Sequence, residues 1–191
     1  MQALVEAGLP VAAVISNRAD AAGLAFAKSR KIPAAAVEHR DHATRESFEA
    51  ALAAEIDRYT PRLVALAGFM RVLTPAFVQR YAGRMLNVHP SLLPAFPGLE
   101  THARALAAGV KIHGCTVHFV TEVLDSGPIV IQAAVPVRPG DSPAQLAARV
   151  LEQEHQIYPR AARWFLENRL VIQSGTVRVK GGDAQFAIAA G

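Results

Sequence analysis

The sequence of 191 residues contains a single cysteine, Cys115, which excludes an internal disulfide bond. This scarcity fits a reducing compartment, and the β-rich neighbours of Cys115 favour an inert buried thiol over a nucleophile. No apolar run is long enough to span a bilayer, and no basic start followed by an apolar segment marks a signal peptide. We therefore expect a cytoplasmic protein.

Charged residues make up only 19% of the chain and hydrophobic residues 51%, which excludes a disordered chain. The basic residues give a formal net charge of +4 but are scattered. A nucleic-acid binder usually gathers them on one stripe with interleaved aromatics, and no such stripe is visible. We expect neither nucleic acid nor a membrane as a partner, although the positive charge could attract anionic small molecules such as phosphates.

Short apolar runs alternate with helical patterns in the first part of the chain. Strands and helices are predicted in turn at 11–15, 21–30, 32–37, 45–59 and 63–67. Thr74 and Pro75 then supply a helix cap and a proline at the first helical position, and Gly83 supplies a stop. This alternation predicts an α/β fold, a doubly wound and mostly parallel sheet.

The second part of the chain has a different pattern. Two β-rich segments, 115–120 and 129–137, are joined by a turn at 125–128, so we expect an antiparallel strand pair added to the sheet. Ser142 begins a long amphipathic helix, 170–179 suggests a closing hairpin, and the Gly/Ala-rich tail should be frayed. No linker divides the chain, so we expect one domain over residues 1–191, with halves of about 1–85 and 86–191.

The stretch from Met85 to Gly98, M-L-N-V-H-P-S-L-L-P-A-F-P-G, organises the rest of the chain. Asn87 and His89 lie two residues apart near the end of a predicted strand, so their side chains should face the same spot. Three prolines follow, which exclude further ladder pairing and predict a stiff irregular loop. Loops at the carboxyl ends of strands are where open α/β sheets bind their ligands.

An amide, an imidazole and a carboxylate are therefore expected where strands end: Asn87, His89 and Asp125. Acyl transfer needs an oxyanion donor, a group that can be cationic or move a proton, and a carboxylate that orients the histidine. Ser91 sits in no nucleophile elbow, so direct attack by a substrate amine is favoured over a covalent intermediate. Taken separately, however, an Asn-x-His pair is more often two satisfied loop side chains, and Asp125 a turn residue.

Three further histidines, His102, His113 and His118, could suggest a metal site. They share no known ligand spacing, and no cysteine or acidic cluster joins them. We expect no metal.

Five ordered motifs cover most of the chain: A-G-F-M-R-V-L at 67–73, N-V-H-P-S-L-L-P-A-F-P-G at 87–98, H-G-C-T-V-H-F-V at 113–120, L-D-S-G-P-I-V at 124–130 and Q-E-H-Q-I-Y-P at 153–159. Together they resemble the phosphoribosylglycinamide formyltransferase family. The resemblance implies a Rossmann-like sheet and a cytoplasmic enzyme of purine synthesis, monomeric or homodimeric. Its co-substrate would be 10-formyltetrahydrofolate, and the formyl acceptor glycinamide ribonucleotide.

The resemblance implies that the half at about 1–85 binds the nucleotide and that the half at about 86–191 holds the folate and catalytic groups. It also implies roles for single residues. Asn87, His89 and Asp125 match the catalytic trio of the family. The resemblance implies that seven residues bind the folate: Arg45, Leu66, Met70, Arg71, Val72, Leu73 and Val78. The two arginines would face the carboxylates of the folate tail. Substrate binding falls to Pro90 and to Glu154, which matches a position that contacts the ribose hydroxyls. Both arginines could equally be solvated surface residues, and Glu154 an exposed helix residue.

The family begins with a buried strand and a Gly-x-Gly-Ser-Asn turn that binds the substrate phosphate, and neither is found here. We expect a translation start assigned too late, with unpaired strand edges, low stability and weak ribonucleotide binding for a chain beginning at Met1. Three alternatives remain: a formyltetrahydrofolate hydrolase, a methionyl-tRNA formyltransferase, or a non-catalytic folate-binding module. The first shares a related catalytic domain, and the second is disfavoured because no RNA-binding C-terminal extension is visible.

Overall fold

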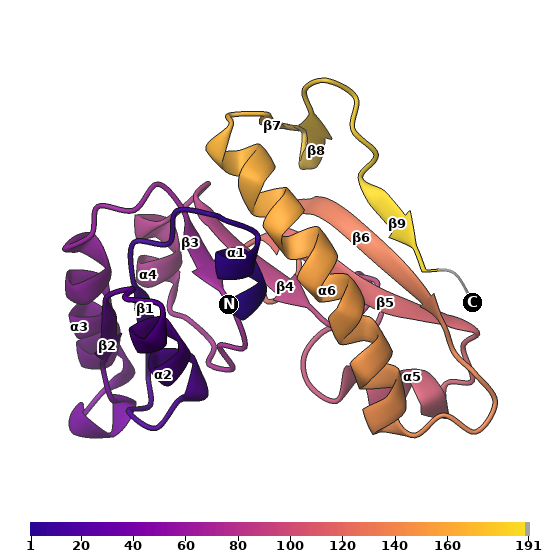
Figure 1. Ribbon diagram of the computed structural model, residues 1–191, viewed down its shortest axis with the longest axis horizontal. Helices are drawn as coiled ribbons and strands as arrows, with labels where there is room; N and C mark the ends of the chain where they lie inside the picture. The colour runs from indigo at the N-terminus through magenta and orange to yellow at the C-terminus, as the bar shows by residue number, and fades with distance from the viewer. Residues whose placement is uncertain (190–191) are drawn as a thin grey trace.

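The structure is a computed structural model that describes residues 1–189 (Figure 1). Its helices are α1 (Gln2–Glu6), α2 (Ala22–Ser29), α3 (Arg45–Asp57), α4 (Pro75–Arg80), α5 (Thr101–Ala107) and α6 (Pro143–Leu166), with a 3₁₀ turn, η1 (His39–Asp41). Its strands are β1 (Val14–Ser16), β2 (Ala34–Ala36), β3 (Val64–Leu66), β4 (Met85–His89), β5 (Ile112–Phe119), β6 (Ile129–Pro136), β7 (Leu170–Gln173), β8 (Thr176–Val179) and β9 (Phe186–Ile188).

The central sheet has the order β3-β4-β5-β6-β9. Its β3–β4 and β6–β9 pairs are parallel, and β5 runs antiparallel to both of its neighbours. The predicted α/β fold is confirmed, as is the added antiparallel pair, which is β5–β6. Within residues 1–189, the parallel pair β1–β2 forms a sheet of its own that is not hydrogen-bonded to the central one.

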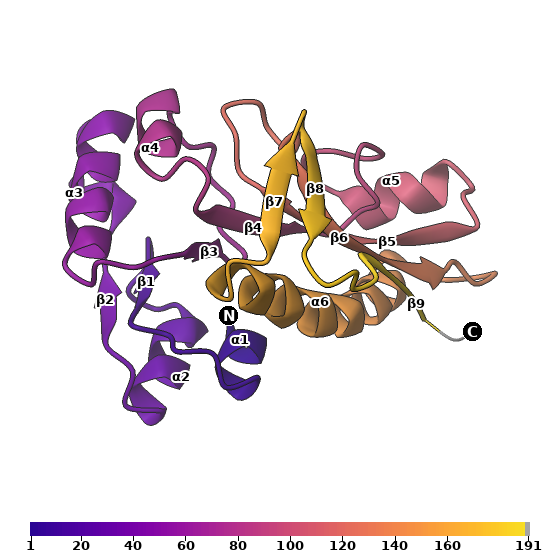
Figure 2. The same ribbon diagram turned by 90° about the horizontal axis from the view of Figure 1, so that it is seen from above.

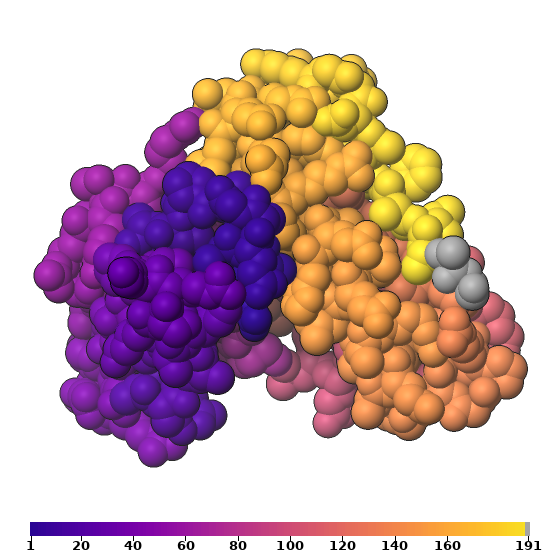
Figure 3. Space-filling view, viewed as in Figure 1, coloured from indigo at the N-terminus to yellow at the C-terminus, as the bar shows by residue number. Residues whose placement is uncertain are grey.

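Helices cover both faces of these sheets (Figure 2). The long helix α6 lies across the central sheet with α1 beside it, while α3 and α4 lie on the side of β1–β2 opposite α2. In the space-filling view, the segment that follows β4 reaches the surface in a notch between the N-terminal part and α6 (Figure 3). None of the helices within residues 1–189 combines the length and the apolarity needed to cross a bilayer.

Local sequence signals explain where the main helices begin. The Thr74 side chain accepts a hydrogen bond from the Phe77 backbone at the start of α4, with Pro75 at its first position. Ser142 and Gln145 form the reciprocal capping box of α6. Both starts agree with the sequence prediction.

The buried side chains form two clusters. The larger lies between α6 and β5–β6 and includes Val117, Ile131 and Leu146. The smaller packs Phe48 of α3 against Phe77 of α4. The buried Tyr158 connects α6 to β3 and β4, because its hydroxyl lies 2.8 Å from the Leu66 carbonyl oxygen and 3.0 Å from the Leu86 carbonyl oxygen.

Two elements differ from the sequence prediction. Helix α5 was not predicted, and the tail is not frayed throughout, since Phe186–Ile188 pairs with β6 as β9. The amide of Gln185 donates to the carbonyls of Val130 and Val177, and these bonds hold the tail in place. Val130 is 55 residues away from Gln185 in the sequence, and Val177 is eight residues away. Local composition therefore could not reveal this strand.

Candidate functional site

Strand β4 places Asn87 and His89 at its carboxyl end. In the antiparallel register with β5, Asn87 lies opposite His118 and His89 lies opposite Thr116. Leu66, at the end of the parallel strand β3, is the other ladder partner of Asn87. The predicted amide–imidazole pair is therefore carried by a strand with a neighbour on each side.

Both ring nitrogens of His89 face acceptors. Nε2 lies 3.1 Å from the Phe96 carbonyl oxygen, and Nδ1 lies 3.5 Å from Oδ2 of Asp125. Because a carbonyl can only accept, Nε2 must carry a hydrogen, and a bare Nδ1 would point its lone pair at a carboxylate. The side chain is 7% exposed. The Phe96 carbonyl and the Asp125 carboxylate therefore hold the His89 ring between them.

Asp125 reaches the site from the loop between β5 and β6. Its backbone is in the left-handed region (φ 51°), and Oδ2 accepts a hydrogen bond of 2.8 Å from the Gly98 backbone. The second oxygen lies 3.8 Å from Nε2 of His118. One carboxylate thus joins the loop after β4, the imidazole of His89 and strand β5.

His118 is a site residue that the sequence analysis considered only as a metal ligand. Its Nδ1 donates to the Phe119 carbonyl (2.9 Å), and burial lowers the pKa of its imidazole. The neutral ring therefore has an acceptor at Nε2, which receives a hydrogen bond of 3.2 Å from Nδ2 of Asn87. This bond assigns the orientation of the Asn87 amide. The available signal was a polar residue within an apolar strand, but only the β4–β5 register places it opposite Asn87.

The loop after His89 is held by a buried polar network. The Thr116 hydroxyl donates to the Ser91 carbonyl (2.7 Å) and accepts from the Leu93 backbone N–H (3.0 Å). The Gln132 amide donates to both the Leu93 carbonyl and the Thr116 oxygen. These bonds fix the loop to β5 and β6 in the absence of regular secondary structure between 90 and 100.

Two loops, after β3 and after β5, carry exposed apolar side chains. Met70 and Val72 are 73% and 56% exposed, and Val123 and Leu124, just before Asp125, are 65% and 55% exposed. Isolated exposed apolar residues are ordinary, but these follow two strands whose ends lie near the site. They leave exposed apolar side chains on the loops that follow β3 and β5.

The remaining predicted folate residues lie around α3 and α4. The Arg71 guanidinium lies over the Phe48 ring, 5.4 Å from its centroid, and Arg45 is the exposed first residue of the same helix. Leu66 and Leu73 are half-buried against the smaller core cluster. Val78 is only 5% exposed and belongs to that cluster, so it supports the surface rather than forming it.

The two predicted substrate residues lie on different elements: Pro90 in the loop after β4, and Glu154 on α6. Pro90 directly follows His89 and is half-buried. Glu154 is on α6, where burial raises the pKa of its carboxyl against the effect of the nearby N-terminal amine. Burial, and to a smaller extent the charge of Glu154, raises the pKa of the Cys115 thiol. Cys115 is therefore the inert thiol that its strand context predicted.

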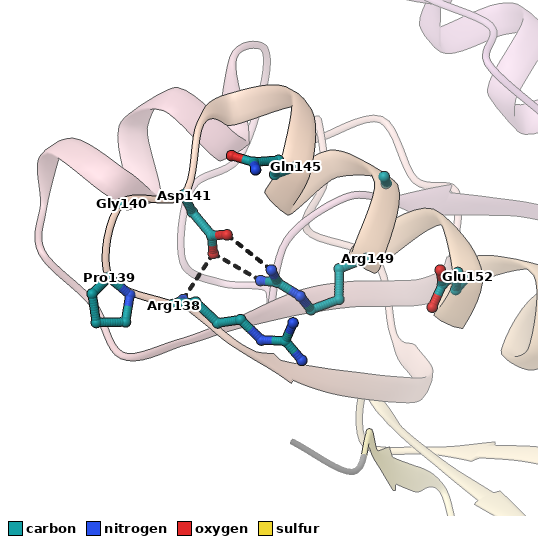
Figure 4. Close-up of a pocket in the computed structure, with 8 residues that line it drawn as sticks. Arg138, Pro139, Gly140, Asp141, Gln145, Arg149 and Glu152 are labelled. Atoms are coloured by element: carbon teal, nitrogen blue, oxygen red, sulfur yellow. Dashed lines mark hydrogen bonds and ion pairs between the residues drawn. The ribbon is translucent and has the colours of Figure 1, made fainter.

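A cavity of about 530 Å³ lies elsewhere, between β6 and the start of α6 (Figure 4). Its walls include the bidentate pair of Arg149 and Asp141, which lowers the pKa of Asp141 to about 2. A second cavity of about 170 Å³ follows β1 and β2. None of the predicted site residues lines either cavity, and the residues described contain no group of three or more potential metal ligands.

Comparison with known proteins identifies the family. A model described as formyl transferase matches residues 2–162. The phosphoribosylglycinamide formyltransferase of Escherichia coli (strain K12) is 50% identical over 171 residues, covering 90% of this chain and 81% of that protein. The solved structure of the phosphoribosylglycinamide formyltransferase from Coxiella burnetii, in complex with CHES, has a TM-score of 0.91 at 45% identity, covering 98% of this chain and 92% of that one. A formyltetrahydrofolate deformylase from Pseudomonas syringae pv. tomato has a TM-score of 0.86 at 29% identity, covering 93% and 61%. The chain therefore belongs to the formyl transferase family.

Proposed function

We propose that this protein transfers the formyl group of 10-formyltetrahydrofolate to the amine of 5'-phosphoribosylglycinamide, a step of purine synthesis. The observation that carries the proposal is the cluster of Asn87, His89 and Asp125 at the carboxyl end of β4. A relative named for this activity is 50% identical over 90% of this chain, which supports the same substrates. No metal takes part in the proposed reaction.

The proposed reaction is direct attack of the substrate amine on the formyl carbon. The Asn87 amide has one N–H left after its bond to His118, and this N–H donates to the developing oxyanion. His89, held as an imidazolium between Phe96 and Asp125, stabilises the same oxygen by its charge. The amine attacks the formyl carbon, which forms the new C–N bond and a tetrahedral oxyanion. When this intermediate collapses, the bond to the folate nitrogen breaks, and the proton released by the amine passes, through water, to that nitrogen.

Asp125 is proposed to perform two tasks. It holds the His89 imidazolium by charge, and it assists the transfer of the amine proton through water. The hydrogen bond from the Gly98 backbone keeps one carboxylate oxygen in place while the other remains close to His118. Removing Asp125 would therefore disturb both the charge and the position of His89.

The folate is proposed to lie against the two apolar loops. The pterin ring would contact Leu66 and the segment from Met70 to Leu73, with the backbone of Arg71 and Leu73 as hydrogen-bonding groups. Val123 and Leu124 would close over it. Arg71 and Arg45 lie at the same end of α3 and would meet the carboxylates of the folate tail.

The ribonucleotide is proposed to bind between Pro90 and Glu154. Glu154 would accept hydrogen bonds from the ribose hydroxyls. The chain would work as one catalytic domain, in the cytoplasm, and as a monomer or homodimer. The catalytic trio lies in residues 86–191, whereas most of the residues proposed to bind the folate lie in residues 1–85.

The test is formyl transfer from 10-formyltetrahydrofolate to glycinamide ribonucleotide by the wild-type chain and by the Asn87→Ala variant. Loss of one oxyanion donor typically lowers the rate by about 10²–10³. The variant should melt as the wild type does, and Gln156→Ala, an exposed change on α6, should leave the rate unaltered. An Asn87→Ala variant that keeps more than about a tenth of the wild-type turnover would contradict the mechanism.

The same assay separates the related activity. A formyltetrahydrofolate deformylase is among the similar structures, at 29% identity. If the wild-type chain released formate without forming a formylated ribonucleotide, hydrolysis would replace transfer as the function. If the chain bound folate and formed neither product, it would be a non-catalytic folate-binding module.

A further inference from the structure

Three buried polar groups lie behind the loop that follows His89. Thr101 and His102 begin α5, and His113 lies near the start of β5. Within residues 1–189, the Thr101 hydroxyl, Nδ1 of His102 and Nε2 of His113 have no hydrogen-bond partner. Thr101 and His113 are 2% and 1% exposed, so bulk water does not serve them.

The two imidazoles lie close together. The ring centroids of His102 and His113 are 5.3 Å apart, and the rings are nearly perpendicular (86°). Thr101 precedes His102 in the first turn of α5. Buried polar atoms are almost always paired, and an internal water with two to four polar partners is the usual solution where protein groups do not suffice.

His113 contacts the loop that follows His89 at two points. The Pro90 carbonyl interacts with the His113 ring and partly opposes the lowering of its pKa by burial. The Phe96 ring lies edge-on to His113, with centroids 5.9 Å apart. Pro90 follows His89 directly, and the Phe96 carbonyl accepts the hydrogen bond from His89 Nε2. A movement of His113 would therefore displace both Pro90 and Phe96, and with them the His89 ring.

We propose that Thr101, His102 and His113 enclose an internal water site, and that His113, supported by this water, is a positioning residue for His89. The kinetic part rests on the proposed function, whereas the water site does not.

The protonation state of His113 agrees with this arrangement. Burial lowers the pKa of His113 to about 4, so the ring is neutral near pH 7. With Nε2 unpartnered, Nδ1 is the nitrogen that can donate to the Pro90 carbonyl, which leaves Nε2 as an acceptor. A water molecule can donate to this acceptor and still bond the Thr101 hydroxyl and His102.

A neutral His113 also suits a cationic His89. The titratable groups that interact with His89 are Asp125, His118, His102 and His113. Burial lowers the pKa of each of the three neighbouring histidines, so none of them places a positive charge beside His89 near neutral pH.

The first test is structural and needs no activity. A high-resolution crystal structure of the wild-type chain should show one or two ordered waters within hydrogen-bond distance of Thr101 Oγ1, His102 Nδ1 and His113 Nε2. Imidazole ¹⁵N NMR should report a protonated Nδ1 and a bare Nε2 for His113. Empty density, a metal ion at this place, or a protonated Nε2 would overturn the water site.

The second test is kinetic. His113→Phe keeps an aromatic ring but removes both nitrogens, and should lower kcat by about 10–100-fold with little change in KM for either substrate. His113→Asn keeps a donor near the Nδ1 position and should recover part of kcat, while His155→Phe on the exposed side of α6 should leave kcat unaltered. Should His113→Phe fail to fold, the Asn variant and the pH profile of kcat carry the comparison. A folded His113→Phe enzyme with wild-type kcat and pH profile would overturn the positioning role. If the wild-type chain forms no formylated product, the proposed function fails, and the water site is still decided by the structural test.

Discussion

Replacement of Thr116 by valine tests how the loop after His89 is held. Thr116 is fully buried on β5, and its hydroxyl serves three hydrogen bonds: it donates to the Ser91 carbonyl and accepts from the Leu93 N–H and the Gln132 amide. Valine has nearly the same shape and keeps the strand propensity, so the change isolates the hydroxyl. Gln132 retains its second bond, to the Leu93 carbonyl.

The expected cost follows from the groups left without partners. The Ser91 carbonyl and the Leu93 N–H each lose the bond to Thr116, and an unpaired buried group costs about 1–3 kcal/mol. We expect a loss of about 4 kcal/mol in the free energy of unfolding. For a chain of this size, that corresponds to a fall of about 8–16 °C in Tm.

Urea unfolding and calorimetry measure this loss, with Thr176→Val as the matched control. Thr176 is exposed on β8, so the same chemical change there should stay within about 0.5 kcal/mol. We also expect kcat of the Thr116→Val enzyme to fall about tenfold or more, because the Phe96 carbonyl of this loop holds the His89 ring. A loss in stability below about 1 kcal/mol would refute the reasoning, because it would mean that Ser91 and Leu93 find other partners.

Three further predictions concern other parts of the molecule. A Cβ on Gly114 would lie 1.9 Å from a backbone oxygen of the neighbouring strand. Gly114→Ala should therefore lower the free energy of unfolding by about 3 kcal/mol or more, whereas Gly23→Ala within α2 should raise it by up to about 1 kcal/mol. Equal effects of the two changes in chemical unfolding would contradict the close approach. The buried Glu49 carboxylate accepts hydrogen bonds from the backbone N–H and the hydroxyl of Thr74. Glu49→Gln should therefore lower the free energy of unfolding in urea by about 1–2 kcal/mol and raise KM for the folate. Unchanged values would show that the 67–73 segment does not depend on this carboxylate. Burial lowers the pKa of His113 from 6.5 to about 4, so the folded state binds fewer protons than the unfolded state between these pH values. The free energy of unfolding should therefore be highest above about pH 6.5 and fall by up to about 3 kcal/mol as the pH drops towards 4. Unfolding curves of the wild type and His113→Phe at several pH values should differ in this slope, and identical slopes would exclude His113 as the cause.

The sequence alone determined the local features of this protein. The strand period of two places Asn87 and His89 on one side of β4, and the prolines after them exclude a regular element. The caps at Thr74 and Ser142 mark the starts of α4 and α6 because their side chains bond backbone groups only three residues away. Each of these features depends on contacts within one turn or one strand.

The tertiary structure decided which distant groups meet. Asp125 reaches His89 only because the loop after β5 folds back over the end of β4, and His118 orients Asn87 only because β5 pairs with β4 in one register. A shift of that register by one residue would turn His118 to the other face of the sheet. The same holds for β9 and for the buried cluster around His113, whose partners come from separate elements. Local periodicity fixes the face on which a side chain lies, whereas the pairing of distant strands fixes its neighbours, and the chemistry of this site depends on those neighbours.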